Sequence, residues 1–130
     1  MIDIEKILDK AIEQDASDVH FTVDSKPILR IKRSLVPIQT MSEITPDDMN
    51  ELYDYLIGGN IEKDETFREE RKIDMSYKYD KIRLRVNISL SGDVPVCTMR
   101  LIKSQLPPYE SLGLPDIVRR MTYQPQGLML

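Results

Sequence analysis

The stretch from Lys81 to Ile102 constrains the fold most, because two strand-like runs flank a turn at Ser91-Gly92-Asp93. In the first run apolar and polar residues alternate, which is the period-2 pattern of a strand with one buried face. The apolar set is Ile82, Leu84, Val86, Ile88 and Leu90, and the polar set is Lys81, Arg83, Arg85, Asn87 and Ser89. The second run is Val94–Ile102. The pattern predicts an antiparallel hairpin with one apolar face.

The register of this hairpin follows if both apolar faces are buried together. On the apolar face it pairs Leu84 with Leu101, Val86 with Met99, and Ile88 with Cys97; on the polar face it pairs Asn87 with Thr98. It also sets Arg85 opposite Arg100. Like charges opposed across two strands destabilise the pair by up to about 1 kcal/mol.

Two facing guanidinium groups suit an anion, because the planar fork of arginine donors matches phosphate or carboxylate. Arg83 shares the face of Arg85, so it either helps to hold the anion or is a solvated neighbour. The alternative for Arg85 and Arg100 is that both are solvated surface residues neutralised by nearby Asp or Glu.

Composition narrows the class of protein. A chain of 130 residues is long enough for one domain with its own core. Its 18 basic and 22 acidic residues give a net charge of -4, which argues against general binding to nucleic acid. No apolar run approaches the ~20 residues of a membrane span, and the acidic N-terminus does not resemble a signal peptide. We therefore expect a cytoplasmic protein.

The sequence does not predict a metal site or a disulfide, since the chain has one histidine and one cysteine. The cysteine, Cys97, cannot form an internal disulfide. It falls on the predicted buried face of the hairpin, which indicates a packing role in a reducing compartment.

Periodicity predicts an α+β fold in which an antiparallel sheet is flanked by helices. Helices are expected after the caps Asp3 and Thr45, and a charged helix over Ile61–Glu70. The apolar stripes of the first two cover Ile4–Ile12 and Met49–Ile57. The expected strands are centred near Val19, Ile28, Leu35, Met75, Leu84 and Met99.

The pattern changes after Lys103. Pro107-Pro108 is typical of a stiff linker, and Leu114-Pro115 opens a short helix. The apolar run Gly127–Leu130 has the composition of a buried parallel strand. We therefore expect one domain over 1–103, and over 104–130 a linker, a short helix and the first strand of a further domain, so that the chain ends inside a larger protein.

Six segments in this order resemble the N-terminal domain of the type II/IV secretion ATPases. They are Ala16-Ser17-Asp18-Val19-His20-Phe21, Pro27-Ile28-Leu29-Arg30-Ile31, Arg83-Leu84-Arg85-Val86-Asn87, Met99-Arg100-Leu101-Ile102, Ser111-Leu112-Gly113-Leu114-Pro115 and Pro125-Gln126-Gly127-Leu128-Met129-Leu130. Only about fifteen residues precede Ala16. This short start makes the chain most similar to the type IV pilus retraction (twitching motility) ATPases.

The resemblance implies a PAS-like domain joined to a RecA-like motor domain that uses ATP and Mg²⁺. It also implies a bacterial homo-hexamer whose partners are its own RecA-like domain, neighbouring subunits and an inner-membrane pilus or secretion platform protein. Such a protein is cytoplasmic and peripheral to the inner membrane. In the family, the arginine of Arg-Val-Asn and that of the next strand approach the ATP phosphates. They correspond to Arg85 and Arg100, as catalytic and nucleotide-binding residues, with Arg83 beside them.

The chain lacks the G-x-x-x-x-G-K-[ST] phosphate loop and the other catalytic motifs of the motor domain. Alone it should not hydrolyse ATP, and no cofactor is expected to bind it tightly. Asp18 and His20 lie on the polar face of the first strand. They are expected either at a subunit interface or as a hydrogen-bonded pair that holds the strand edge.

Two other functions stay open. The chain could be a free-standing PAS-like module that binds a small anionic ligand, or an interaction domain whose helices dock on a partner. A phosphate loop encoded within about ten residues of Leu130 would separate the ATPase interpretation from both.

Overall fold

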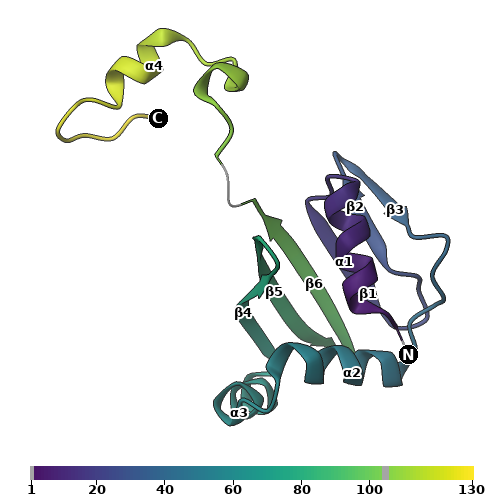
Figure 1. Cartoon of the computed structure of the whole chain (residues 1–130). Helices are drawn as coiled ribbons and strands as arrows, with labels where there is room; N and C mark the ends of the chain where they lie inside the picture. The colour runs from purple at the N-terminus through teal and green to yellow at the C-terminus, as the bar shows by residue number, and fades with distance from the viewer. Residues whose placement is uncertain (1, 104–105) are drawn as a thin grey trace.

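The computed structural model describes residues 2–103 and 106–130. The described helices are α1 (Ile4–Glu13), α2 (Pro46–Ile57), α3 (Ile61–Glu70), the short 3-10 helix η1 (Tyr109–Leu112) and α4 (Asp116–Met121). The strands are β1 (Asp18–Thr22), β2 (Ile28–Ile31), β3 (Ser34–Pro37), β4 (Lys72–Tyr79), β5 (Ile82–Ser91) and β6 (Val94–Ile102). Figure 1 shows one sheet with helices packed on it.

The six strands form one antiparallel sheet in the order β3-β2-β1-β6-β5-β4. Local hairpins build each half, and the two halves join where β1 pairs with β6, near opposite ends of the sheet-forming region of the chain. The expected α+β class, an antiparallel sheet flanked by helices, is confirmed. β1 is therefore a central strand.

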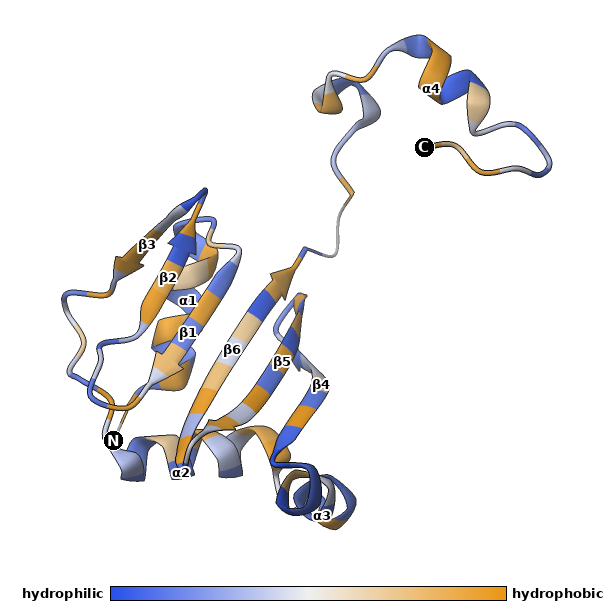
Figure 2. Ribbon diagram, turned by 180° about the vertical axis from the view of Figure 1, so that it is seen from behind, coloured by the Kyte–Doolittle hydropathy of each residue, from blue (hydrophilic) through white to orange (hydrophobic). Residues whose placement is uncertain are grey.

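The sheet has one covered face and one open face. Helix α1 packs against the covered face, and α2 runs across one end of the sheet (Figure 1). In β4, β5 and β6, alternate residues face this core, and β1 and β2 also contribute; its strand residues include Val19, Phe21, Leu29, Leu84, Val86, Ile88, Cys97 and Met99. Seen from the other side, in the part of the chain that the structure describes, no helix lies over the strands (Figure 2).

Side-chain caps fix the N-termini of α1 and α2, as the sequence predicts. The Asp3 carboxylate accepts a hydrogen bond from the Lys6 backbone amide at 3.0 Å. Thr45 and Asp48 form a reciprocal capping box at the start of α2, and Gly58 ends that helix in the left-handed conformation that glycine adopts without strain. These contacts satisfy backbone groups that have no partner within the helix.

Several strand ends differ from the sequence prediction. The sequence predicts a turn over Lys78-Tyr79-Asp80, but β4 continues to Tyr79, which pairs with Ile82. The Tyr79 hydroxyl donates to Asp9 at 2.8 Å, so a contact with α1 extends the strand. The sequence also predicts strands over Ile28–Lys32 and Leu35–Ile38, but β2 ends at Ile31 and β3 begins at Ser34, which pairs with Ile31, and Lys32 takes φ 58° in the tight turn between them.

The C-terminal segment contains η1 and α4 and extends away from the sheet (Figure 1). None of the described residues 106–130 is buried. Gly127–Leu130 does not form the predicted strand in this chain, since it pairs with no other described strand. The start of the predicted linker, 104–105, lies outside the described residues, so the domain division stays a prediction. Among the described helices, none combines the length and the apolar character that a bilayer crossing requires.

Candidate anion-binding site

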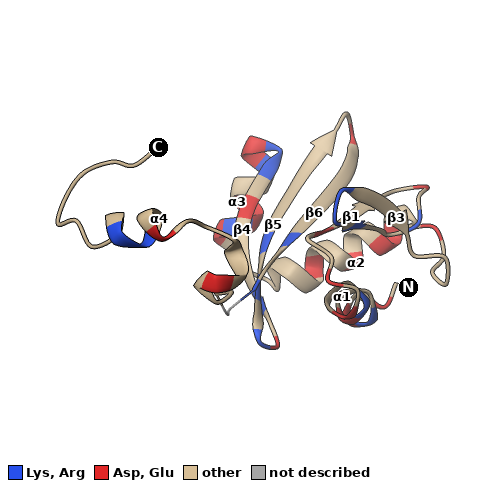
Figure 3. Ribbon diagram, turned by 90° about the horizontal axis from the view of Figure 1, so that it is seen from above, with Lys and Arg blue, Asp and Glu red and all other residues tan. Residues whose placement is uncertain are grey.

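The β5–β6 hairpin has the predicted register. Arg85 lies directly opposite Arg100, and Asn87 lies opposite Thr98. Leu84, Val86 and Met99 are completely buried on the covered face, which fixes the arginines on the open face. Figure 3 shows basic segments on both β5 and β6. The packing of one face thus sets the geometry of the other.

One row of paired residues crosses the open face from edge to edge. In strand order it contains Leu35, Arg30, Asp18, Arg100, Arg85 and Ser76. The row brings a third arginine, Arg30, to the site through the central strand. Sequence reasoning missed Arg30 because the pairing of β1 with β6 links residues 82 positions apart.

Asp18 lies between Arg30 and Arg100 and only 5% of its surface is exposed. Its Oδ1 accepts from Arg100 Nε at 3.0 Å, and its Oδ2 lies 3.4 Å from Arg30 Nε. The Ser17 hydroxyl also donates to Oδ2, at 2.8 Å. Burial alone would raise the pKa of Asp18, but the hydrogen bonds from Ser17 and Arg100 and the Arg100 charge lower it overall. Asp18 is therefore an ionised group beneath two arginines.

Arg85 is held less firmly. Its Nε lies 3.7 Å from Asp74 Oδ1, and both side chains are more than half exposed. Arg83 is exposed and makes no hydrogen bond or ion pair with the rest of the described chain. The expectation that acidic residues neutralise the pair is thus met for Arg100 and only weakly for Arg85.

The open face is a basic area on an acidic chain. Arg83 lies opposite Lys78 on β4, and both share the face of the arginine pair. Six strand cations therefore lie on this face, against the two acids Asp18 and Asp74; the cations are Arg30, Lys72, Lys78, Arg83, Arg85 and Arg100. The surplus of positive charge favours an anion.

The prediction that Asp18 and His20 form a hydrogen-bonded pair at a strand edge is wrong, because β1 is central and each side chain has another partner. Asp18 binds the arginines, and His20 Nδ1 lies 3.3 Å from Thr98 Oγ1 on β6. His20 Nε2 is buried without a hydrogen-bond partner among the described residues. The structure does not test the expected role of these residues at a subunit interface.

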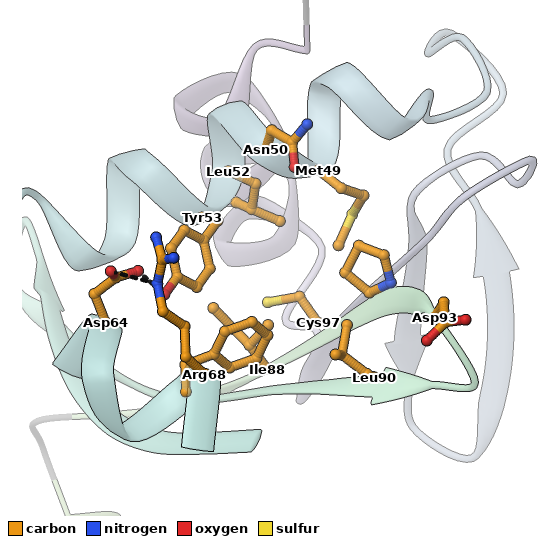
Figure 4. A pocket seen from close by; sticks show the side chains of 12 residues that line it. Met49, Asn50, Leu52, Tyr53, Asp64, Arg68, Ile88, Leu90, Asp93 and Cys97 are labelled. Carbon is orange, nitrogen blue, oxygen red and sulfur yellow. Dashed lines mark hydrogen bonds and ion pairs between the residues drawn. The ribbon is translucent and has the colours of Figure 1, made fainter. Parts of the chain in front are cut away.

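A separate cavity of about 310 Å³ lies between α2, α3 and the turn end of the β5–β6 hairpin (Figure 4). Its walls are mostly apolar and include Met49, Leu52, Phe67, Ile88, Leu90, Pro95 and Cys97. At its rim Asp64 accepts from Tyr53 at 2.8 Å and from Arg68 Nε at 2.8 Å. Two acids, Asp64 and Asp93, line the cavity beside a single cation, Arg68, so its charge favours a small anionic ligand less than the charge of the open face does.

The residues of the open face do not fit a metal ion. Arginine and lysine donate hydrogen bonds and offer no lone pair to Mg²⁺, which prefers oxygen ligands. Within residues 2–103 and 106–130, no group of three or more His, Cys, Asp or Glu side chains could hold one. Any Mg²⁺ that accompanies a nucleotide here would need ligands from outside the described chain.

Comparison with known proteins agrees with this fold. No protein-family model matches the chain. The type IV pilus ATPase PilU of Pseudomonas aeruginosa is 22% identical over 130 residues, which is 99% of this chain and 33% of PilU. The crystal structure of the pilus retraction motor PilT with bound ADP superposes with a TM-score of 0.79 at 25% identity, over 95% of this chain and 36% of PilT. These matches indicate an N-terminal domain of a type II/IV secretion and pilus ATPase.

The chain also shares its fold with a further ATPase. The Legionella pneumophila ATPase DotB superposes with a TM-score of 0.76 at 21% identity, over 95% of this chain and 35% of DotB. The chain spans about a third of the length of each of these relatives. The sheet that carries the arginine row therefore has the same fold in this chain as the matching parts of PilT and DotB.

Proposed function

We propose that this chain is the N-terminal domain of a pilus-retraction or secretion motor, and that Arg85 and Arg100 contact the phosphates of ATP. The single observation that supports this role most is the direct opposition of the two arginines on an open, basic sheet face. The similarity to PilT, a retraction motor solved with ADP, supplies the nucleotide class.

The chemistry follows from the side chains. Phosphoryl transfer spreads negative charge over the oxygens of the transferring group, and a guanidinium stabilises that charge with two parallel hydrogen bonds. Arg85 and Arg100 each have a side chain that is 69% exposed, so both can reach a phosphate held outside the domain. Arg83 lies at the end of the same face and adds charge without being opposed by another arginine.

In this proposal the triphosphate and Mg²⁺ are held on a RecA-like domain joined to the chain after the linker. Neighbouring subunits of a homo-hexamer supply the moving contacts, and an inner-membrane pilus or secretion platform protein receives the motion. The exposed apolar residues of the C-terminal segment are available to pack on such a domain. They include Leu112, Leu114, Ile117, Met121 and Leu128.

The test is substitution in the full-length protein. Arg85→Ala or Arg100→Ala should lower kcat with a smaller effect on KM, because interactions made only in the transition state act on turnover. Losses of arginine fingers in other phosphoryl-transfer enzymes cost roughly 10³ to 10⁵ in rate. Arg68→Ala is the matched control, since Arg68 is also an exposed arginine paired through Nε to an aspartate.

Wild-type turnover by either site variant, with the oligomer intact by native mass spectrometry, would exclude that residue from the chemistry. The isolated 130-residue chain provides a second check. It should release no phosphate from Mg-ATP and should bind it weakly or not at all in calorimetry. Steady turnover by the purified chain would contradict the proposal that the triphosphate site lies elsewhere.

A further inference from the structure

Asp18 is the most enclosed charged group of the open face, and it has a different relation to each arginine of the site. Its Oδ1 accepts the Arg100 Nε hydrogen bond at 3.0 Å. Its side chain is 7% exposed, whereas the Arg100 side chain that it holds is 69% exposed. The base of the Arg100 guanidinium is therefore anchored in the sheet, while its outer edge faces solvent.

We propose that Asp18 is a positioning residue that fixes Arg100 through Nε and presents the two Nη groups of that arginine to the phosphate. The inference rests on the proposed function of Arg100. Within the described chain the Nη groups of Arg100 make no hydrogen bond, so they stay available. A guanidinium that is hydrogen-bonded at Nε loses little further conformational entropy when its Nη groups bind an oxyanion. This preorganisation strengthens the binding of the oxyanion.

The opposite arginine has no such anchor. Arg85 Nε lies 3.7 Å from Asp74, which is beyond hydrogen-bonding distance, and the Asp74 side chain is 59% exposed. Arg100 is thus the fixed member of the pair. Arg85 is the adjustable member, which takes up its final position as the phosphate arrives.

Charge alone would argue against an aspartate at this place, because a carboxylate repels the incoming phosphate. Two features offset the repulsion. Arg30 lies on the other side of Asp18, with its Nε 3.4 Å from Oδ2, so the carboxylate is shared by two cations. Ser17 donates a further hydrogen bond to the same oxygen. An Asp18 substitution therefore has two opposite effects on turnover. Removal of the negative charge should speed turnover, and loss of the contact that positions Arg100 should slow it.

The first test uses the chain itself. The Nε–Hε signals of the arginines are followed by ¹⁵N NMR in wild type, Asp18→Asn, Asp18→Ala and the control Asp64→Asn. In wild type the Arg100 signal should relax like the rigid backbone, while that of Arg83 should be mobile. Both Asp18 variants should release Arg100, the alanine more fully because the Asn amide oxygen can still accept from Nε. Asp64→Asn should release only Arg68. Equal mobility of Arg100 and Arg83 in wild type would overturn the inference.

The second test measures turnover in the full-length protein. Asp18→Asn should lower kcat about 10- to 100-fold, by analogy with the loss of partners that orient metal-binding side chains. KM should change less, and Asp64→Asn should leave both unchanged. The double variant Asp18→Asn with Arg100→Ala should be no slower than Arg100→Ala alone, because the two residues act as a unit.

The outcomes separate the two hypotheses. If Arg100→Ala slows turnover and both Asp18 variants match or exceed wild type, Asp18 does not position Arg100 and the phosphate role of Arg100 survives. If Arg100→Ala itself turns over normally, the proposed function fails, whatever the NMR shows. A fall in kcat shared by Asp18→Asn and Arg100→Ala, with an unchanged melting temperature, is the expected result.

Discussion

The two faces of the sheet are made by the same strands and have opposite properties. On the covered face Leu84, Val86 and Met99 are completely buried, and their packing leaves them no alternative position. On the open face their neighbours Arg85 and Arg100 have side chains that are 69% exposed. Burial on the covered face fixes the strand register, and the register sets which residues oppose each other on the open face. A rigid backbone can therefore carry exposed side chains that are still able to move.

Asp18 is the exception on the open face, since it is nearly as buried as the core. It forms ion pairs with two arginines, Arg30 and Arg100. The open face therefore contains one fixed contact, between β1 and β6, beside the looser pair on β4 and β5. The following experiments measure how strongly the two faces, and these two contacts, differ.

The largest expected difference is in thiol reactivity. Burial raises the pKa of the Cys97 thiol to about 12 from its ordinary value of 9.0, so the reactive thiolate is ~10³ rarer than for an exposed cysteine at neutral pH. In Ser76→Cys, a second thiol lies on the open face, where Ser76 is exposed. Iodoacetamide should label position 76 at least a thousandfold faster, as peptide mass spectrometry can measure. Comparable rates would mean that the covered face opens readily.

The next largest difference is in stability, and it compares two neighbours on β5. Leu84→Ala removes a completely buried side chain and should cost about 2 to 5 kcal/mol of unfolding free energy. Arg85→Ala removes an exposed side chain and one of two facing like charges, so its effect should stay within about 1 kcal/mol. Urea denaturation of both variants measures this contrast. A loss above 2 kcal/mol for Arg85→Ala would assign that arginine a structural role.

The covered face was largely predictable from the sequence, because alternation along β5 and β6 leaves one register that buries both apolar sets. That register predicts Arg85 opposite Arg100, and the observed strand pairing confirms it. The end of β4 was missed because Tyr79 is held by Asp9, which is 70 positions away. The residue types in a turn do not indicate a contact between residues so far apart in the sequence.

The candidate site was only half predictable for the same reason. Nothing local to Asp18 shows that β1 joins β6, and this pairing is what brings Asp18 to Arg100. A polar residue in a strand with an alternating pattern indicates only an outward face. The useful signal would have been the number of arginines on the predicted polar faces, since Arg30, Arg85 and Arg100 together favour acidic partners on the same face. The roles of these arginines in ATP hydrolysis stay predictions.

A smaller difference is expected in acid. The pKa of Asp18 is lower in the folded chain than in the unfolded chain, where it is near 3.9. The stabilisation by ionised Asp18 is therefore fully present above about pH 4. It is lost as the pH falls through the lower folded value. Thermal melts from pH 7 to 2 should show a steeper acid loss for wild type than for Asp18→Asn. Parallel curves would mean that the arginine contacts of Asp18 do not favour its ionised form.

The smallest effect is expected at the other acid of the open face. Asp74 lies 3.7 Å from Arg85, and both side chains are more than half exposed, so solvent screens their attraction. A double-mutant cycle with Asp74→Asn and Arg85→Ala should give a coupling energy of about 0 to 0.5 kcal/mol in urea denaturation. The same cycle for Asp18→Asn and Arg100→Ala should give a larger value, because Asp18 is almost completely buried and lies within hydrogen-bonding distance. Adding about 0.5 M salt should remove most of the first coupling and leave most of the second, because screening weakens exposed pairs far more than buried ones. Equal coupling energies in the two cycles would show that burial does not distinguish the two contacts, and that Arg100 is no more firmly held than Arg85.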